Sequence, residues 1–154
     1  MSGDISSRLD ALLAERDAER QKYSSRVEEN IRKANAAEKR FLELRDDVVR
    51  PAMEEVGRWL VGKNIQFEID CSNYVLFNSS YPAIEFEMVL DERGRGYSNP
   101  FYRVVWNHDK VELTKNVRIY GGGTQASKAG DITLEELTKE KVQDDLLDVI
   151  KTAI

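Results

Sequence analysis

The chain has 154 residues, of which 33% are charged and 41% are hydrophobic, and its formal net charge is -5 at pH 7. This length is typical of one domain, and the hydrophobic content is too high for a disordered chain. The charges form no basic block, so the electrostatic footprint of a nucleic-acid-binding protein is missing. We therefore expect a folded protein that binds no nucleic acid.

The cellular location follows from three further observations. The only cysteine is Cys71, which cannot form an internal disulfide. The N-terminus lacks the apolar region of a signal peptide, and no window approaches the apolar length of a membrane span. We expect a cytoplasmic protein that makes no membrane contact.

The first part of the chain predicts one long helix. Over residues 4–61 the only glycine is Gly57 and the only proline is Pro51, and charged residues and alanines separate a sparse apolar stripe. A proline inside a helix removes one hydrogen bond and clashes with the preceding turn, so we expect a kink or short break near Arg50. Gly62 is typical of a residue that caps the C-terminal end of a helix.

Two interpretations of this stripe compete. In the first, the helix is a coiled-coil helix whose heptad seam faces a partner. The seam positions hold Leu9, Leu13, Arg16, Arg20, Tyr23, Val27, Asn30, Ala34, Ala37, Phe41, Leu44 and Val48. Arg16 and Arg20 would weaken pairing where they lie, whereas Asn30 is a residue type that fixes the register of coiled coils.

In the second interpretation, the helix is amphipathic and packs on the rest of the chain. We favour packing for residues 40–62, where large apolar residues are dense and include Trp59. Residues 5–38 have fewer large apolar groups, so we expect them to stand away from the rest of the chain, where the heptad seam can pair. The predicted organisation is a projecting or pairing helix over residues 1–39 and a single α+β domain over residues 40–154.

Alternating apolar residues predict an antiparallel sheet of four to five strands within residues 65–119. The predicted strands are residues 65–70, 74–77, 83–90, 101–106 and 110–117. Asn107, His108 and Asp109 have the composition of a tight turn between the last two. Residues 78–82 and 91–100 are rich in Ser, Gly, Asn and Pro, which predicts turns.

The C-terminal part predicts a loop followed by a helix. Residues 121–130 are rich in Gly, Ser and Ala. Thr133 and Glu136 have the spacing of a capping box, so we expect a final helix from there to about Ala153, with a possible interruption near Thr138. The predicted fold class is therefore α+β: a long N-terminal helix, an antiparallel sheet and a C-terminal helix.

Residue types that carry chemistry are scarce. Cys71 and His108 are the only thiol and imidazole, which is too few for a structural zinc site. The glycine run at residues 121–123 does not match a Walker sequence, and the two arginines within residues 93–97 supply little affinity for phosphate. We predict no catalytic residue, no cofactor and no metal site.

Carboxylates gather on the polar side of the predicted sheet. They include Glu68, Glu85, Glu87 and Glu112, and the spacing of Glu85 and Glu87 places both on one face. Such a face can dock an arginine-rich segment, bind a divalent cation or supply an acid–base pair. Solvated ion pairs are the simplest interpretation.

These observations predict a non-catalytic, cytoplasmic interaction or adaptor protein rather than an enzyme. Its partner is another protein or a second copy, which would form a homodimer. The recognition surface is the helix seam, the acidic sheet face, or both; its seam residues are Leu9, Leu13, Tyr23, Val27 and Ala34. One alternative is a small acidic, chaperone-like accessory protein that holds a partner segment on its sheet. The other is an enzyme or metal-binding protein that uses the carboxylate face.

Overall fold

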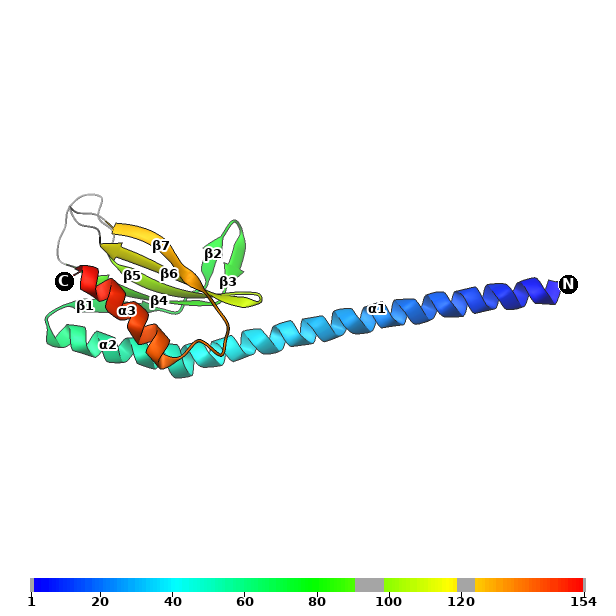
Figure 1. Cartoon of the computed structure of the whole chain (residues 1–154), viewed down its shortest axis with the longest axis horizontal. Coiled ribbons are helices and arrows are strands. Elements are labelled where there is room, and N and C mark those ends of the chain that lie inside the picture. Colours follow the sequence, from blue (N-terminus) through cyan, green and yellow to red (C-terminus); the bar gives the residue numbers. More distant parts are fainter. Residues whose placement is uncertain (1, 91–98, 119–123, 154) are drawn as a thin grey trace. The chain divides into compact units, whose positions relative to one another are not determined.

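The computed structural model describes residues 2–90, 99–118 and 124–153, with side chains described for residues 4–90, 99–116 and 126–153. The chain divides into two compact units, Met1–Ala37 and Glu38–Ile154. The described residues of the first unit, 2–37, belong to α1 (Ser2–Leu44). The second unit contains the end of α1, a sheet and two further helices (Figure 1). This α+β arrangement confirms the predicted fold class.

The predicted irregularity near Pro51 is a π-helical segment rather than a break. This segment, η1 (Arg45–Val49), joins α1 to α2 (Arg50–Gly62), and the Arg50 N–H donates to the Arg45 carbonyl. Proline has no N–H, and its ring collides with the carbonyl four residues earlier in a regular α-helix. A wider turn directly before Pro51 relieves that collision, so the helix continues through it.

The π-helical segment shifts the apolar stripe by one residue. The buried side chains before it are Phe41 and Leu44, and the next is Val49, five residues later. A regular helix would bring a residue four positions on to the same face, so the extra residue changes which side chains enter the core. Our prediction that Trp59 packs into the domain is therefore wrong: its side chain is 50% exposed.

The end of α2 is capped by Asn64 and not, as predicted, by Gly62. Asn64 has a left-handed backbone, with φ 62°. The Asn64 N–H donates to the Val61 carbonyl, and the Ile65 N–H donates to the Leu60 carbonyl. These two bonds form a Schellman motif, in which asparagine can replace the usual glycine.

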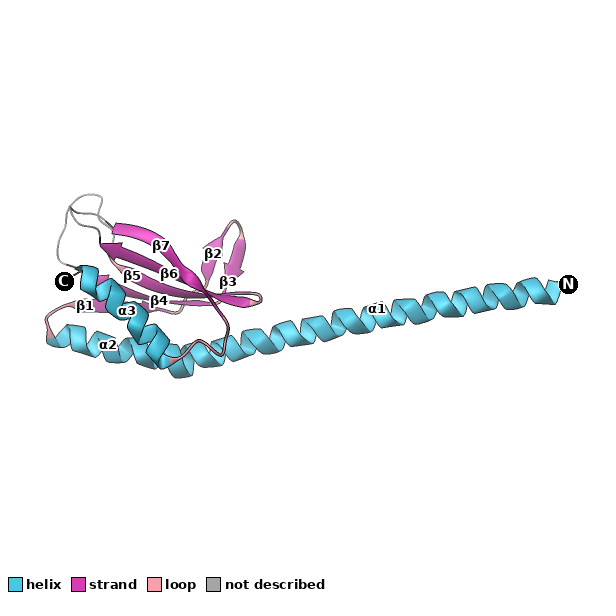
Figure 2. Cartoon of the chain, viewed as in Figure 1, coloured by secondary structure: helices cyan, strands magenta, loops and turns pink. Residues whose placement is uncertain are grey.

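Five antiparallel strands form the main sheet in the order β1-β4-β5-β6-β7 (Figure 2). Their bounds are β1 (Gln66–Asp70), β4 (Ala83–Val89), β5 (Phe101–Asn107), β6 (Lys110–Arg118) and β7 (Thr124–Ile132). The predicted hairpin between β5 and β6 is confirmed, and His108 takes a left-handed φ of 56° in its turn. A separate hairpin consists of β2 (Tyr74–Leu76) and β3 (Ser79–Tyr81).

Two segments predicted as loops or turns contain strands. Residues 79–81 form β3, within the predicted turn 78–82. Residues 124–130 belong to β7, which pairs along β6 with a register shift near Leu113. Small and polar residues dominate both segments, so neither has the apolar alternation that identifies a half-buried strand. Pairing with a neighbouring strand overrides that weak local preference.

The C-terminal helix, α3 (Lys139–Ala153), begins later than predicted. The Glu136 carboxylate accepts hydrogen bonds from the Thr133 N–H (3.2 Å) and hydroxyl (3.0 Å), so the capping-box residues do interact. They close a turn instead of opening the helix. The helix starts at Lys139 because the Thr138 hydroxyl accepts a hydrogen bond from the Lys141 N–H (3.2 Å) and caps it.

The core lies between one face of the sheet and the helices α2 and α3 (Figure 1). Its largest fully buried side chains are Phe41, Met53, Leu60, Ile84, Phe86, Met88, Tyr102, Leu113 and Leu146. Tyr102 donates a hydrogen bond of 2.6 Å to the buried carboxylate of Asp145, which Lys141 also contacts at 3.2 Å. Burial and this hydrogen bond raise the pKa of Tyr102 far above its usual range. The pair fastens α3 to β5.

Polar contacts also join α2 to α3. The Lys139 ammonium lies 2.8 Å from the Glu55 carboxylate, and Gln143 Nε2 donates to the same carboxylate at 3.2 Å. The hydrogen bonds from Lys139 and then Gln143 lower the pKa of Glu55.

Within the described residues, no helix has the length and apolar character needed to cross a membrane.

Gly57 allows α2 to approach β1 closely. A Cβ atom at position 57 would overlap the ring of Phe67. That ring is stacked on Phe86, with 5.5 Å between the ring centroids. The ring of Phe67 therefore occupies the space that a side chain at position 57 would need.

We expect Gly57→Ala to lower the free energy of unfolding by about 1–3 kcal/mol, because the added methyl group overpacks the contact with Phe67. Urea unfolding measures the change. Gly62→Ala is the matched control: outside its chain neighbours and its own helix backbone, no atom lies within 4 Å of a Cβ built there. Alanine is a better helix former than glycine, so this control should raise stability by up to about 1 kcal/mol. Equal effects of the two substitutions would contradict the close approach.

Candidate functional site

The sheet face opposite the core carries most of the predicted carboxylates. Glu68 of β1 lies opposite Glu87 of β4, and Asp70 lies opposite Glu85 on the same pair of strands. Because side chains alternate along a strand, all four lie on one face. The structure therefore brings together Glu68, Glu85 and Glu87 from the predicted recognition residues.

Glu112 lies on the same face but in a different group of charges. It is opposite Val105 of β5 and Asp131 of β7, two strands away from β4. Its carboxylate accepts a hydrogen bond from Asn107 (2.7 Å) and lies 3.7 Å from the Lys110 ammonium. The predicted acidic face is thus two separate groups, one on β1 and β4 and one at the β5–β6 turn.

Ion pairs extend the second group to β7. Asp131 lies 3.0 Å from Lys128 and 3.2 Å from Lys110. The contacts from Lys128 and Lys110 lower the pKa of Asp131, and Asp131 in turn raises the pKa of Lys110. These charges neutralise one another.

Side chains of the same chain also bind two carboxylates of the first group. The Arg103 guanidinium donates to Glu85 (2.8 Å), and the Asn99 amide donates to Glu87 (2.8 Å). No hydrogen bond or ion pair from the described part of the chain reaches the carboxylate of Glu68.

Arg103 organises this face. Its guanidinium carbon lies 4.5 Å from the ring centroid of Tyr74 and 4.6 Å from that of Phe101, while one nitrogen pairs with Glu85. Stacking on aromatic rings and pairing with a carboxylate are both favourable for a planar guanidinium. Because Tyr74 begins β2, this contact holds the β2–β3 hairpin against the sheet.

A cavity of about 250 Å³ lies beside Arg103. It is lined by Asp70, Ser72, Asn73, Tyr74, Val75, Ala83, Glu85 and Arg103. Hydrogen bonds from the Ser72 side chain and backbone lower the pKa of Asp70. Across the described residues, no group of three or more His, Cys, Asp or Glu side chains is arranged to hold a metal ion. The charged groups of the cavity are engaged with one another or with the backbone.

Cys71 and His108 have separate neighbours. The Cys71 sulfur lies 4.0 Å from an Arg50 nitrogen, whereas the His108 ring lies edge-on to Tyr81, with 5.5 Å between centroids. Cys71 thus contacts α2, whereas His108 contacts β3. The structure therefore shows no contact that would make these two residues a nucleophile and its base.

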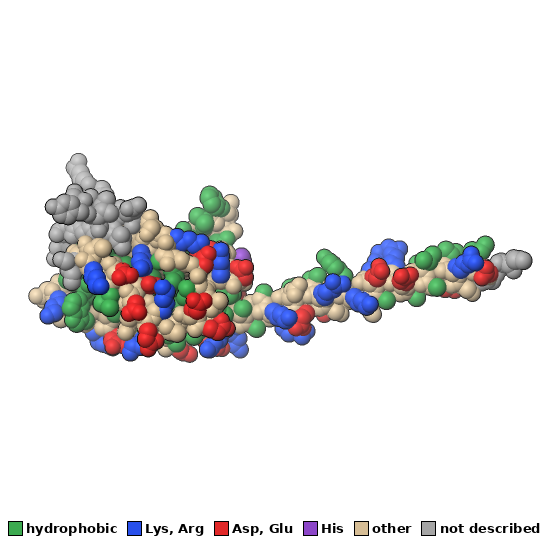
Figure 3. Space-filling view, in the orientation of Figure 1, with side chains coloured by type: hydrophobic (Ala, Val, Ile, Leu, Met, Phe, Trp, Pro, Cys, Tyr) green, Lys and Arg blue, Asp and Glu red, His purple; other side chains and the backbone are tan. Residues whose placement is uncertain are grey.

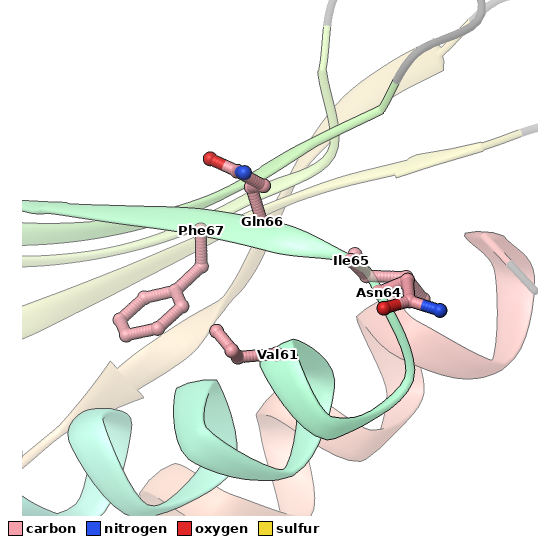
Figure 4. A pocket seen from close by; sticks show the side chains of 5 residues that line it. All are labelled: Val61, Asn64, Ile65, Gln66 and Phe67. Atoms are coloured by element: carbon pink, nitrogen blue, oxygen red, sulfur yellow. The ribbon is translucent and has the colours of Figure 1, made fainter.

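A second cavity, of about 390 Å³, lies at the end of α2 (Figure 4). It is lined by Val61, Asn64, Ile65, Gln66 and Phe67. The Phe67 side chain points toward α2, while Gln66 points to the opposite side of β1. The lining offers apolar and amide groups but no titratable side chain, so acid–base chemistry is not available there.

The β2–β3 hairpin presents apolar side chains at its tip. Val75, Leu76 and Phe77 are 65%, 43% and 91% exposed, and Figure 3 shows hydrophobic side chains gathered at this hairpin. Phe77 and Asn78 both have a left-handed backbone, with φ 50° and 68°. This is the geometry of a two-residue type I′ turn, which asparagine adopts readily and phenylalanine does not.

The helical unit Met1–Ala37 also exposes large apolar residues. Leu9, Leu13, Tyr23 and Val27 are 54%, 54%, 69% and 38% exposed, and Ala34 is exposed as well. Charged side chains lie between the hydrophobic ones along this helix (Figure 3). All five predicted seam residues are thus accessible within this unit.

A third apolar surface is a groove between α2 and α3. Its volume is about 460 Å³, and it is lined by Val56, Trp59, Leu147, Ile150 and Lys151. Trp59 and Leu147 are each about half exposed. We refer to this feature as the α2–α3 groove.

Two motifs considered in the sequence lie outside the described residues. They are the arginine-containing segment 93–97 and the glycine run 121–123. Comparison with protein-family models, with curated proteins and with solved structures finds no match for this chain. The assignment of function therefore rests on the residues themselves.

Sequence reasoning missed three features of these surfaces. The α2–α3 groove depends on the phase shift at η1; Pro51 indicates an irregularity there but not the extra residue in the turn. The stacking of Arg103 requires strand register, which the alternation of single strands does not specify. The hairpin tip did leave a signal: Phe77-Asn78 separates an apolar pair from two serines, and asparagine favours a left-handed turn.

We expect Phe77→Asn to raise the free energy of unfolding by about 1 kcal/mol, because asparagine tolerates the left-handed conformation and the phenylalanine ring buries little surface. Asn78→Ala, at the neighbouring left-handed position, should lower it. Urea unfolding of both variants checks the pair. A loss of stability in Phe77→Asn would mean that the ring contributes contacts to the folded chain.

Proposed function

We propose that this chain is a non-catalytic interaction protein that associates with a second copy of itself through the helical unit Met1–Ala37. The supporting observation is the exposure of Leu9, Leu13, Tyr23 and Val27 at heptad spacing on one helix. Exposed apolar side chains arranged in one stripe are typical of a surface that meets a partner. Burying the stripe against an equivalent helix removes it from water.

The other exposed apolar residues of this helical segment also favour association. Helix propensity alone gives marginal stability in water, and most helices in proteins depend on packing of an apolar face. Within Met1–Ala37 the apolar residues Ile5, Leu12 and Ile31 are more than half exposed, in addition to the seam. A partner helix would supply the packing that this unit lacks.

An enzymatic or metal-binding role has weaker support. Glu85, Glu87 and Glu112 each accept hydrogen bonds from side chains of the same chain. A carboxylate that serves as a general base must reach a substrate proton. These contacts instead assign the carboxylates to the organisation of the sheet face.

The test is the molar mass in solution of the full chain, measured by light scattering. We expect a dimer, and we expect Leu13→Gln combined with Val27→Gln to shift it to monomer, because both changes remove apolar surface from the seam. Ala11→Gln combined with Ala18→Gln is the matched control, since both positions lie off the seam and glutamine is a good helix former.

A version that starts at Arg40 provides a second comparison. Loss of the dimer in this version, with retention in the control variant, would locate association in the helix. A monomeric full chain would contradict the proposal. A dimer that survives both the double seam variant and the truncation would place the interface on another surface.

A second candidate is the chaperone-like accessory role, with the partner segment bound in the α2–α3 groove rather than on the sheet. The groove offers Val56, Trp59 and Leu147 to an apolar segment, and helix-in-groove binding is a common mode of peptide recognition. The net charge of -5 favours a segment that carries lysine or arginine.

We expect an amphipathic helical peptide of leucine and lysine to bind with an affinity that falls at least about tenfold in Leu147→Glu, because a carboxylate cannot replace the apolar contact. Calorimetric titration measures the affinity. Leu76→Glu is the control, since Leu76 is similarly exposed but lies on the hairpin. Equal affinities for the two variants would exclude the groove as the binding surface.

A further inference from the structure

We propose that the two copies pair in antiparallel orientation, about a two-fold axis that passes between Gln21 and Lys22. This inference rests on the proposed function, because it specifies how the seam of Met1–Ala37 meets a second seam. The evidence is the position of the charged residues on that seam, together with the point at which the seam enters the core of the chain.

A parallel pair in register is unfavourable. Each seam residue would meet its own counterpart, so Arg16 would face Arg16 and Arg20 would face Arg20 in neighbouring layers. Four guanidinium groups would then lie within the interface, with like charges directly opposed. Like charges in a partly desolvated interface repel, and removing them from water adds a further cost.

The antiparallel arrangement removes this conflict. With the axis between Gln21 and Lys22, Arg20 faces Tyr23 of the second copy, and Arg16 faces Val27. A guanidinium packs favourably on a tyrosine ring, and the aliphatic stem of arginine packs on valine. Two-fold symmetry repeats each contact, so all four arginines of the seam gain a compatible neighbour.

The residues beside the seam support the same register. Glu19 precedes Arg20 and flanks the seam, and in this register it lies next to Arg26 of the second copy. The symmetry produces two such pairs of opposite charge. Moving one heptad in one direction places Arg16 against Arg20, and moving one heptad in the other direction places Arg26 against Arg26.

The size of the side chains and the length of the unit also fit. Leu9 faces Ala34 of the second copy, and Leu13 faces Asn30, so each large residue meets a smaller one. The outermost layer pairs Ser6 with Ala37, the last residue of the helical unit. The next seam residue, Phe41, is fully buried in its own domain and is not available for pairing.

In this register the seam is used from Ser6 to Ala37. At a rise of about 1.5 Å per residue, the 15.5 residues from the axis to Ala37 span about 23 Å. The two Ala37 residues would then lie about 46 Å apart along the paired helices. In a parallel pair they would be neighbours.

Cross-linking of full-length chains distinguishes the orientations. Leu9→Cys and Ala34→Cys are prepared separately in a Cys71→Ser background, mixed in equal amounts and oxidised, since a disulfide requires close Cβ atoms. We expect the mixed product that joins position 9 to position 34. A parallel pair would instead give two homodimers, joined at 9–9 and at 34–34.

A charge exchange provides a second measurement. Glu19→Arg should weaken the dimer, because it replaces both attractive pairs with Arg26 by repulsive ones, and adding Arg26→Glu should restore it. In a parallel pair these side chains do not face each other, so the second change would give no rescue. Analytical ultracentrifugation measures the dissociation constants.

The outcomes separate this inference from the proposed function. Homodimeric cross-links, or an absence of rescue in a chain that still dimerises, would overturn the antiparallel orientation and leave self-association standing. All three cross-links in similar yield would overturn the single register. A monomeric parent chain would overturn both the orientation and the proposed function.

Discussion

Burial of one sheet face beneath α2 and α3 is the constraint on which the rest of the domain depends. The strands alternate so that Phe86, Tyr102 and Leu113 enter the core, and burial of such side chains is the main favourable contribution to folding. Tyr102 and Asp145 add a hydrogen bond inside this layer, where an unpaired polar group would be costly. Once this face is covered, the opposite face must be compatible with water, and its carboxylates follow from that requirement.

The exposed surfaces are either acidic or apolar. They differ in whether side chains of the same chain bind their exposed groups. On the sheet face, Arg103 pairs with Glu85 and the Asn99 amide donates to Glu87, so side chains of the same chain bind both carboxylates. Both contacts are partly buried, and they keep the face polar. The helix seam, the hairpin tip and the α2–α3 groove have no such compensation, because apolar surface gains only from being covered. This difference is why the apolar surfaces, and not the acidic ones, carry the functional argument.

Elements with strong periodicity could be predicted from the sequence, whereas elements fixed by neighbours could not. Alternation in residues 83–90 and the turn at His108 identified β4 and the β5–β6 hairpin, since local pattern and tertiary role agree there. Strand β7 lacks apolar alternation, so its sequence predicts a loop. It forms a strand because it pairs with β6. The exposure of Trp59 could not be predicted, because Pro51 indicates an irregularity in the helix but not that the turn before it holds one extra residue. The exposure of Leu9 and Leu13 could be inferred from the sequence. The surface that covers them could not, because it belongs to another molecule.

The π-helical segment η1 has a consequence for which changes of sequence the chain can accept. Substitutions within Arg45–Val49 leave the number of residues between Leu44 and Val49 unchanged, so the core residues on either side stay in phase. Deleting one residue would place Leu44 and Val49 four positions apart, which a regular α-helix also brings to one face, so the core residues would stay in phase. Its cost would be the return of the collision between the Pro51 ring and the preceding turn. Inserting one residue would add a second extra position to this turn and rotate Phe41 and Leu44 by about 100° around the helix axis, away from the core. The segment can therefore lose a residue without changing the phase of the core but cannot gain one, whereas an exposed surface loop accepts insertions readily.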